Sequence, residues 1–225
     1  MSGPARFALY WAPTLEDPLH ALGSRWLGRD AETGAALPQP DLPGMAELTA
    51  EARRYGLHAT LKAPFRLARP YAEFRAAAAA LARRTRPFLL PPLRVDELDG
   101  FLALRESAPC PPLQALADAC VIELDPFRAP LSEEELARRR RSPLSPRQEA
   151  YLERWGYPYV LDQWRFHVTL SRRLGAAERA LLRPAAEALL GEAAARPRLV
   201  CELCLFSEAA PGAPFLIAER LPLGG

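Results

Sequence analysis

The chain has 225 residues, of which 49% are hydrophobic and 25% charged, and its formal net charge is +2. This composition is typical of a folded globular protein, and the length allows one large domain or two small lobes. The weak net charge excludes a strongly basic nucleic-acid coat, so we expect no DNA partner. Because the sequence has no run of 18 apolar residues and no N-terminal signal peptide, we expect a cytoplasmic protein with no membrane partner.

The first half of the sequence predicts strands and helices in alternation. Prolines and Gly56 separate them, and Asp99-Gly100 predicts a tight hairpin turn. In chain order, the predicted elements are a strand at 6–12, a helix at 45–55, a strand at 57–65, a helix at 71–86, and strands at 93–98 and 101–105.

The second half begins with a predicted helix at 112–124 and a polar helical insertion at about 125–163. Within the insertion, Ser132 and Ser145 each begin a capping-box pattern, which predicts two short helices. After the insertion the pattern of the first half returns, with a strand at 164–172, a helix at 176–195, and strands at 199–207 and 214–221.

The two halves match element for element, because each has a strand that contains H-x-T-L, then a helix, then an antiparallel pair of strands. We therefore expect an α+β fold in which two pseudo-symmetric lobes, each an antiparallel sheet with outer helices, surround a central cleft. The lobes are expected to cover about 45–110 and 164–225 of a single bilobal domain at 1–225.

Two of the three histidines in the chain begin the matching tetrapeptides, His58 to Leu61 and His167 to Leu170. Thr occurs only six times in the chain, so two histidines each followed by Thr at the second position are a rare coincidence. Side chains at i and i+2 of a strand share a face. The side chains predicted to face the cleft are therefore His58, Thr60 and Lys62 from the first motif and His167, Thr169 and Ser171 from the second.

A facing pair of histidines is suited to phosphodiester chemistry, because near neutral pH one imidazole can accept a proton while the other donates one. Thr60 and Thr169 can donate hydrogen bonds to phosphate oxygens, and Lys62 can balance the charge that builds there. Neither histidine lies near clustered acidic residues in the sequence, and Cys201 with Cys204 lacks a second cysteine pair. We therefore expect no metal and no other cofactor.

Two tyrosines and a serine extend the set of candidate substrate contacts. Tyr10 lies on the first predicted strand and Tyr159 lies just ahead of the second motif. Ser171 offers an additional hydrogen-bond donor beside that motif. The arginine run at 138–141 follows an acidic helix start, which predicts a solvated helix end. The alternative is a patch that steers a phosphorylated substrate.

The two motifs resemble the signature of the 2H phosphoesterase superfamily, in which H-x-[ST]-hydrophobic occurs twice. The stretches 6–13, 55–67 and 165–174 are most similar to the branch encoded alongside phosphonate-utilisation genes. The resemblance implies a bilobal fold with a V-shaped cleft, and it implies catalysis by His58 and His167 and phosphate binding by Thr60 and Thr169. In that branch Thr-Gly often follows the second motif, where this chain has Ser171-Arg172.

These observations predict an enzyme, a phosphoric diester hydrolase that opens the cyclic phosphate of a small nucleotide or sugar phosphate without a metal. One alternative is an RNA-end processing or ligase-type enzyme that acts on 2′,3′-cyclic phosphate termini, with a short RNA end as its partner. Another is a non-catalytic module that binds a phosphorylated metabolite. The pseudo-symmetry leaves open which histidine is the acid and which is the base.

Overall fold

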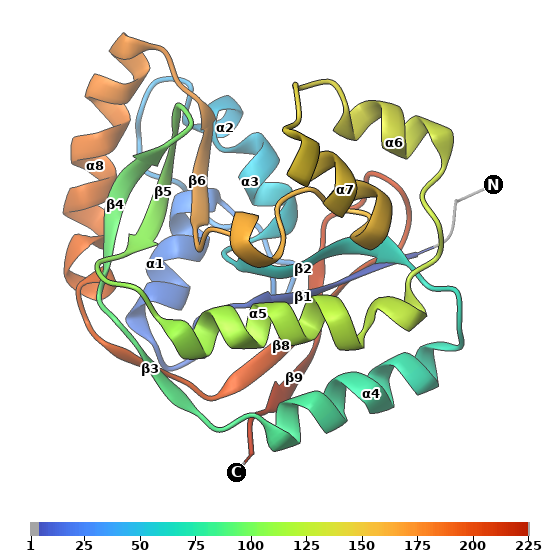
Figure 1. Ribbon diagram of the computed structural model, residues 1–225. Coiled ribbons are helices and arrows are strands. Elements are labelled where there is room, and N and C mark those ends of the chain that lie inside the picture. Colours follow the sequence, from blue (N-terminus) through green and yellow to red (C-terminus); the bar gives the residue numbers. More distant parts are fainter. Residues whose placement is uncertain (1–4, 225) are drawn as a thin grey trace.

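Seven antiparallel strands form the main sheet of the computed structural model, which describes residues 5–224 (Figure 1). The order across the sheet is β4-β5-β6-β2-β1-β8-β9, and β3 and β7 form a separate two-stranded sheet. The strands are β1 (Arg6–Trp11), β2 (Ala59–Arg66), β3 (Phe88–Leu90), β4 (Leu93–Leu98), β5 (Phe101–Glu106), β6 (Val168–Arg173), β7 (Arg198–Val200), β8 (Glu202–Glu208) and β9 (Leu216–Pro222).

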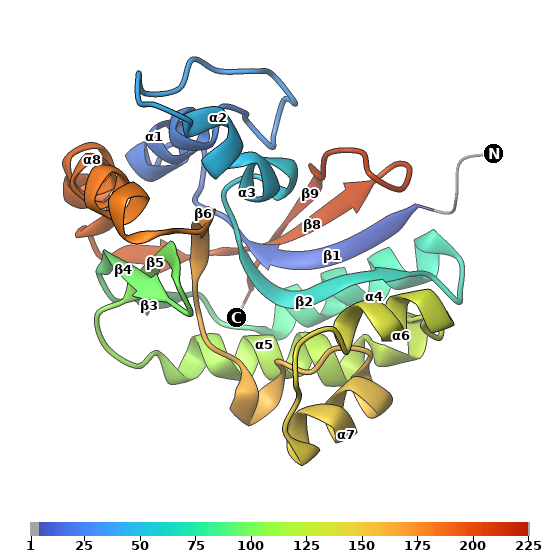
Figure 2. The same ribbon diagram turned by 90° about the horizontal axis from the view of Figure 1, so that it is seen from above.

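Helices cover both faces of this sheet (Figure 2). Helix α5 packs on β2 and α4 on β9, whereas α8 packs on β4 and α3 on β6. The helices are α1 (Pro18–Leu27), α2 (Met45–Leu48), α3 (Ala50–Tyr55), α4 (Tyr71–Arg84), α5 (Pro111–Glu123), α6 (Glu133–Arg139), α7 (Pro146–Trp155) and α8 (Ala176–Ala194), with 3-10 turns η1 (Asp125–Phe127) and η2 (Leu161–Gln163). No helix in residues 5–224 combines the length and apolar character needed to cross a membrane.

The predicted α+β class is confirmed, and most predicted elements lie within a few residues of the observed ones. The expected helix at 45–55 is divided at Thr49, which ends α2 and precedes α3. Both capping boxes of the insertion are formed, by Ser132 at the start of α6 and by Ser145 at the start of α7. The sequence analysis missed the β3–β7 pair, because strands of three residues are too short to show a periodic pattern.

The predicted assignment of strands to lobes is wrong. Strands β4 and β5, which follow the first motif, pair with the second-motif strand β6. Strands β8 and β9, which follow the second motif, join the first-motif strand β2 through β1. The ranges 45–110 and 164–225 are therefore interleaved in one sheet, because the internal repeat sets the order of elements along the chain but not their pairing partners.

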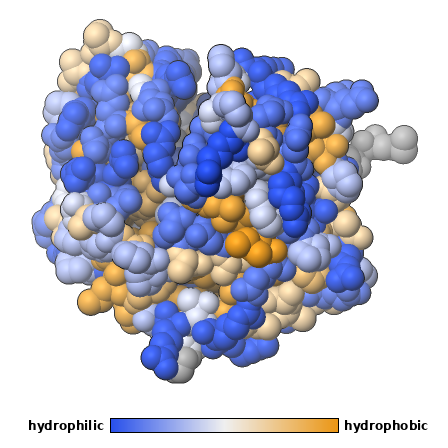
Figure 3. Space-filling model, viewed as in Figure 1, coloured by the Kyte–Doolittle hydropathy of each residue, from blue (hydrophilic) through white to orange (hydrophobic). Residues whose placement is uncertain are grey.

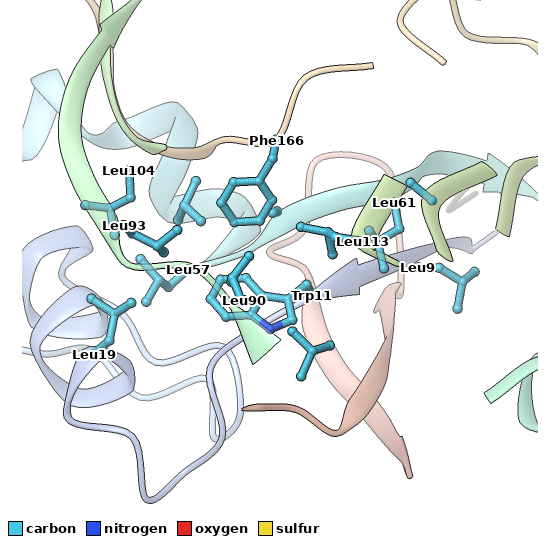
Figure 4. Packing of buried hydrophobic residues seen from close by; sticks show 14 of the residues in the cluster. Leu9, Trp11, Leu19, Leu57, Leu61, Leu90, Leu93, Leu104, Leu113 and Phe166 are labelled. Atoms are coloured by element: carbon cyan, nitrogen blue, oxygen red, sulfur yellow. The ribbon is translucent and has the colours of Figure 1, made fainter. Parts of the chain in front are cut away.

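Both halves of the sequence also share one hydrophobic core (Figure 4). Leu9 and Trp11 from β1 and Leu61 from β2 belong to the same buried cluster as Leu104 from β5. Phe166, which precedes β6, packs against Trp11 with ring centroids 5.7 Å apart. This packing fixes β2 and β6 relative to each other, because each strand packs into the core through the face opposite its polar residues.

Candidate functional site

The two motifs meet where β2 and β6 pair through Ala59 and Val168. Because the strands are antiparallel, residues on either side of this pair lie opposite one another, with Cβ atoms typically about 5 Å apart. Ala59 and Val168 are completely buried, so the neighbouring side chains point to the other face. This register sets each motif histidine opposite the threonine of the other motif: His58 opposite Thr169, and His167 opposite Thr60.

All four of these side chains line one cavity of about 470 Å³. Tyr10 lines it as well, and an adjoining cavity of about 220 Å³ shares Thr60, Tyr157 and His167 with it. The two cavities therefore lie side by side, and together they are called the cleft. On the molecular surface a hollow is visible between strands β4–β6 and helix α7 (Figure 3).

Each histidine ring is oriented by the backbone carbonyl two residues before it. His58 Nδ1 lies 2.9 Å from the Gly56 oxygen, and His167 Nδ1 lies 2.8 Å from the Arg165 oxygen. A carbonyl can only accept, so in the neutral rings the proton is on Nδ1 and the lone pair is on Nε2. Gly56 has a φ of +78°, and a Cβ there would lie 2.4 Å from Ala31 Cβ, so this turn requires glycine.

Burial lowers the pKa of both imidazoles. The pKa of His58 falls to about 4, because burial outweighs the effect of the Gly56 carbonyl; the nearby His167 lowers it further. Tyr10, which is 1% exposed, stacks on the His58 ring with centroids 3.9 Å apart. Burial also lowers the pKa of His167, with smaller contributions from Arg165 and Arg105. Both rings are therefore neutral at pH 7 in the free protein.

Lys62 does not face the cleft, and the prediction that it shares a face with His58 is wrong. The register of β1 and β2 shifts twice, from Tyr10 opposite Thr60, to Leu9 opposite Lys62, to Phe7 opposite Phe65. Each shift is a β-bulge that adds one residue to β2, and the first turns Lys62 to the opposite face. There its ammonium donates to the Val121 carbonyl at 3.0 Å and lies 3.6 Å from Asp125.

Replacing Lys62 with methionine should therefore change kcat/KM by less than about threefold. Burial lowers the pKa of Lys62 to about 8 despite Asp125, and a charge held there is replaceable by an apolar side chain of similar size. Asp125 would keep its ion pairs with Arg128 and Arg154. Steady-state kinetics of Lys62→Met beside the wild type tests this expectation. A hundredfold loss of activity with unchanged thermal stability would contradict the placement of Lys62 outside the cleft.

Ser171 likewise does not line the cleft, in contrast to its predicted role as a hydrogen-bond donor to the substrate. It is 2% exposed, and its hydroxyl accepts a hydrogen bond from the Leu102 amide and donates to the Arg172 carbonyl. The β5–β6 register shifts between Phe101 and Ala103. The Ser171 hydroxyl therefore takes the place of a backbone carbonyl as acceptor for the Leu102 amide.

The predicted aromatic contact Tyr159 lies in the adjoining cavity and is 38% exposed. Tyr157 packs edge-on against it, with ring centroids 5.6 Å apart. Phe101 and Trp164 line the same cavity, and Trp164 donates its indole N–H to the Thr60 carbonyl at 2.7 Å. This end of the cleft is therefore aromatic and is anchored to the first motif.

The opposite end of the cleft is cationic. The sequence analysis missed Arg6 and Arg54, and it considered the run at 138–141 as a steering patch only as an alternative to a solvated helix end. Four arginines line it, and they come from three elements: Arg6 from β1, Arg54 from α3, and Arg138 and Arg139 from α6. No local pattern distinguishes them among the 29 basic residues of the chain. The run at 138–141 is thus only in part a solvated helix end. No group of three His, Cys, Asp or Glu side chains gathers into a metal-binding cluster in the described residues 5–224.

Comparison with known proteins identifies curated relatives of about twice this length. Ribose 1,5-bisphosphate phosphokinase PhnN of Janthinobacterium sp. (strain Marseille) is 42% identical over 231 residues, which cover 98% of this chain and 51% of that protein. The protein of the same name from Laribacter hongkongensis (strain HLHK9) is 40% identical over 75% of this chain and 40% of its own length. This chain thus spans about half the length of the relatives it matches, or less.

Among solved structures, E. coli LigT complexed with phosphate aligns over 100% of both chains, with a TM-score of 0.47 and 16% identity. LigT complexed with 3′-AMP aligns over 99% of this chain and 100% of its own, with a TM-score of 0.46 and 16% identity. The family model described as Protein of unknown function (DUF1045) matches residues 60–216, which include both H-x-T-L threonines and the second histidine. The chain belongs to this DUF1045 family.

Proposed function

We propose that this protein is a cyclic phosphodiesterase that opens the cyclic phosphate of a small sugar phosphate or nucleotide by general acid–base catalysis. One observation carries the proposal: two histidines, each fixed through Nδ1, and two threonine hydroxyls project from paired strands into one cleft. This is the arrangement expected of the 2H phosphoesterases that the motifs resemble. It provides a proton acceptor, a proton donor and two hydrogen-bond donors around one phosphate.

The unequal environments of the two histidines assign their roles. His58 has the more strongly lowered pKa, so it remains neutral and can take a proton from the attacking water. The oxygen of that water forms the new bond to phosphorus while the bond to the leaving alkoxide breaks. His167, whose pKa a bound phosphate anion would raise, then protonates the alkoxide. Thr60 and Thr169 donate to the non-bridging oxygens.

This assignment predicts a bell-shaped dependence of kcat/KM on pH with an acidic optimum. The acidic limb reports protonation of the base, His58, whose pKa is about 4. The alkaline limb reports loss of the proton from the acid, His167, whose pKa lies below its usual 6.5 in the free protein. We expect the optimum between these values, measured as initial rates from pH 3.5 to 8. A rate that stays at its plateau up to pH 8 would contradict the assignment.

The relatives named as kinases suggest a phosphorylated ribose as the substrate class. The proposal depends on the histidines and not on that name. A kinase that binds its nucleotide through a G-x-x-x-x-G-K-[ST] loop needs a lysine directly after a glycine. The one lysine of this chain, Lys62, follows Leu61. Ribose 1,2-cyclic phosphates and 2′,3′-cyclic nucleotides therefore form the first substrate panel.

Turnover of this panel, followed by ³¹P NMR in the presence of EDTA, tests the proposal directly. We expect one class of cyclic phosphate to be opened to a monoester, with activity retained in EDTA. Calorimetric binding of the panel without turnover of any member would instead identify a non-catalytic binding module. Complete loss of activity in EDTA, restored by a divalent cation, would contradict the metal-independent mechanism.

The aromatic end of the cleft favours one second candidate, an enzyme that acts on RNA ends. Tyr159, Tyr157 and Trp164 could stack a base beside the threonine of the first motif. Short RNAs that end in a 2′,3′-cyclic phosphate distinguish the two functions. Turnover of such RNAs at least tenfold faster than turnover of the mononucleotide would favour the RNA-end enzyme.

A further inference from the structure

The cationic end of the cleft has more positive charge than one cyclic phosphate needs. Four arginines line it, whereas Glu51 is the one acidic residue among its lining side chains. A cyclic phosphodiester carries a single negative charge, and the two histidines and two threonines already surround it under the proposed function.

Two of these arginines, Arg6 and Arg54, share one buried carboxylate as their counter-charge. Arg6 and Arg54 both donate to the carboxylate of Glu208, which is completely buried. Burial opposes ionisation of that carboxyl, but the two arginines outweigh it and keep the pKa of Glu208 below its usual range. The two arginines and Glu208 thus form one ion-paired group whose net charge is +1.

Arg138 and Arg139 are different, because in the part of the chain that the structure describes neither forms an ion pair or a side-chain hydrogen bond. The Arg139 guanidinium lies 4.9 Å from the centre of the Tyr157 ring, and its buried Nε has no acceptor. A buried guanidinium donor without a partner is costly, and an oxygen of a bound anion would satisfy it. Burial accordingly lowers the pKa of Arg139.

Helix α6 is anchored beside the cleft by contacts near its N-terminus. Arg66 of β2 donates to the Pro130 carbonyl at 2.8 Å and to Glu135 at 2.9 Å. The capping box of Ser132 uses the same Glu135 carboxylate. The two free arginines are therefore presented by an anchored helix, and the geometry does not depend on a flexible loop.

From these observations we infer that Arg138 and Arg139 form a second anion subsite, and that the substrate carries a phosphate monoester in addition to its cyclic phosphate. A guanidinium presents parallel N–H donors that match the oxygens of a dianionic phosphate. The inference rests on the proposed function for the cyclic phosphate, and it adds the substrate class and the residues that select it. The Arg139 guanidinium lies over the ring of Tyr157, and this contact would keep the guanidinium oriented toward the cleft.

Two matched pairs of substrates test this inference. One is ribose 1,2-cyclic phosphate with and without a 5-phosphate, and the other is adenosine 2′,3′-cyclic phosphate with and without a 5′-phosphate. We expect the wild type to prefer the doubly phosphorylated member, and Arg139→Ala to reduce its kcat/KM by about 10- to 100-fold. The member without the monoester should change by less than about threefold in the same variant, and Arg139→Lys should retain an intermediate preference.

Arg141→Ala is the matched control, because Arg141 is exposed, belongs to the same arginine run and does not line the cleft. It should leave both substrates unaffected, and the thermal unfolding midpoint of each variant verifies folding. Equal turnover of both members by the wild type would overturn the second subsite and leave the proposed function standing. If neither member is opened, the proposed function fails, and calorimetric binding of ribose 5-phosphate still decides the subsite: loss in Arg139→Ala supports it, and unchanged binding overturns it.

Discussion

Alanine at His58 or at His167 is expected to reduce kcat on a cyclic phosphate by about 10²- to 10⁴-fold, the usual contribution of a positioned acid or base. The two variants should differ on an activated ester. With a p-nitrophenyl leaving group, departure needs no protonation, so His167→Ala should retain far more activity than His58→Ala. Steady-state rates on a cyclic phosphate and on bis(p-nitrophenyl) phosphate provide both comparisons.

The remaining histidine of the chain supplies a control for these variants. His20 lies outside the cleft, where its Nε2 is 3.4 Å from Asp30. His20→Gln should keep kcat within about threefold of the wild type. Near-normal rates for both His58→Ala and His167→Ala, with folding verified by circular dichroism, would show that the cleft does not act through its histidines.

The sequence predicted the polar face of each motif correctly over its first residues and failed beyond them. Alternation places Ala59 and Leu61 in the core and Thr60 in the cleft, as observed. It fails at Lys62 because a bulge in β2, between Thr60 and Lys62, shifts the register against β1. Bulges depend on how a neighbouring strand fits, and a single sequence does not show that neighbour.

The insertion illustrates the same division between local and long-range information. Capping residues are local signals, so both helices could be predicted from Ser132 and Ser145. Their position over the cleft depends on residues far away in sequence, such as the contact of Arg66 with Glu135. The sequence therefore predicted the helices, but it did not decide between a solvated helix end and a substrate-steering patch for the arginine run at 138–141.

Glu208→Ala should destabilise the fold by about 2–3 kcal/mol, because it removes hydrogen bonds to charged groups and leaves two partly exposed guanidinium groups without their counter-charge. The Glu208 side chain is completely buried and accepts hydrogen bonds from Arg6, from Arg54 and from the Gly212 amide. Its removal would leave these two guanidinium groups of the cleft without their shared counter-charge. Urea unfolding at pH 7 measures the effect, and Glu192→Ala is the control. The Glu192 carboxylate is 90% exposed and pairs with Arg196 just beyond the end of α8, so less than about 0.5 kcal/mol is expected.

The pH dependence of this difference separates an electrostatic anchor from simple loss of packing. Because the arginines hold the pKa of Glu208 below its usual 4.5, the stabilisation by this carboxylate is fully present above pH 4.5. It is lost as the pH falls through the lowered pKa, where the folded protein also takes up the proton. The unfolding free energies of the wild type and Glu208→Ala should therefore converge as the pH falls below 4.5. A difference that stays constant over this range would mean that the carboxylate acts by filling space, and Arg6 and Arg54 would then line the cleft without a fixed counter-charge.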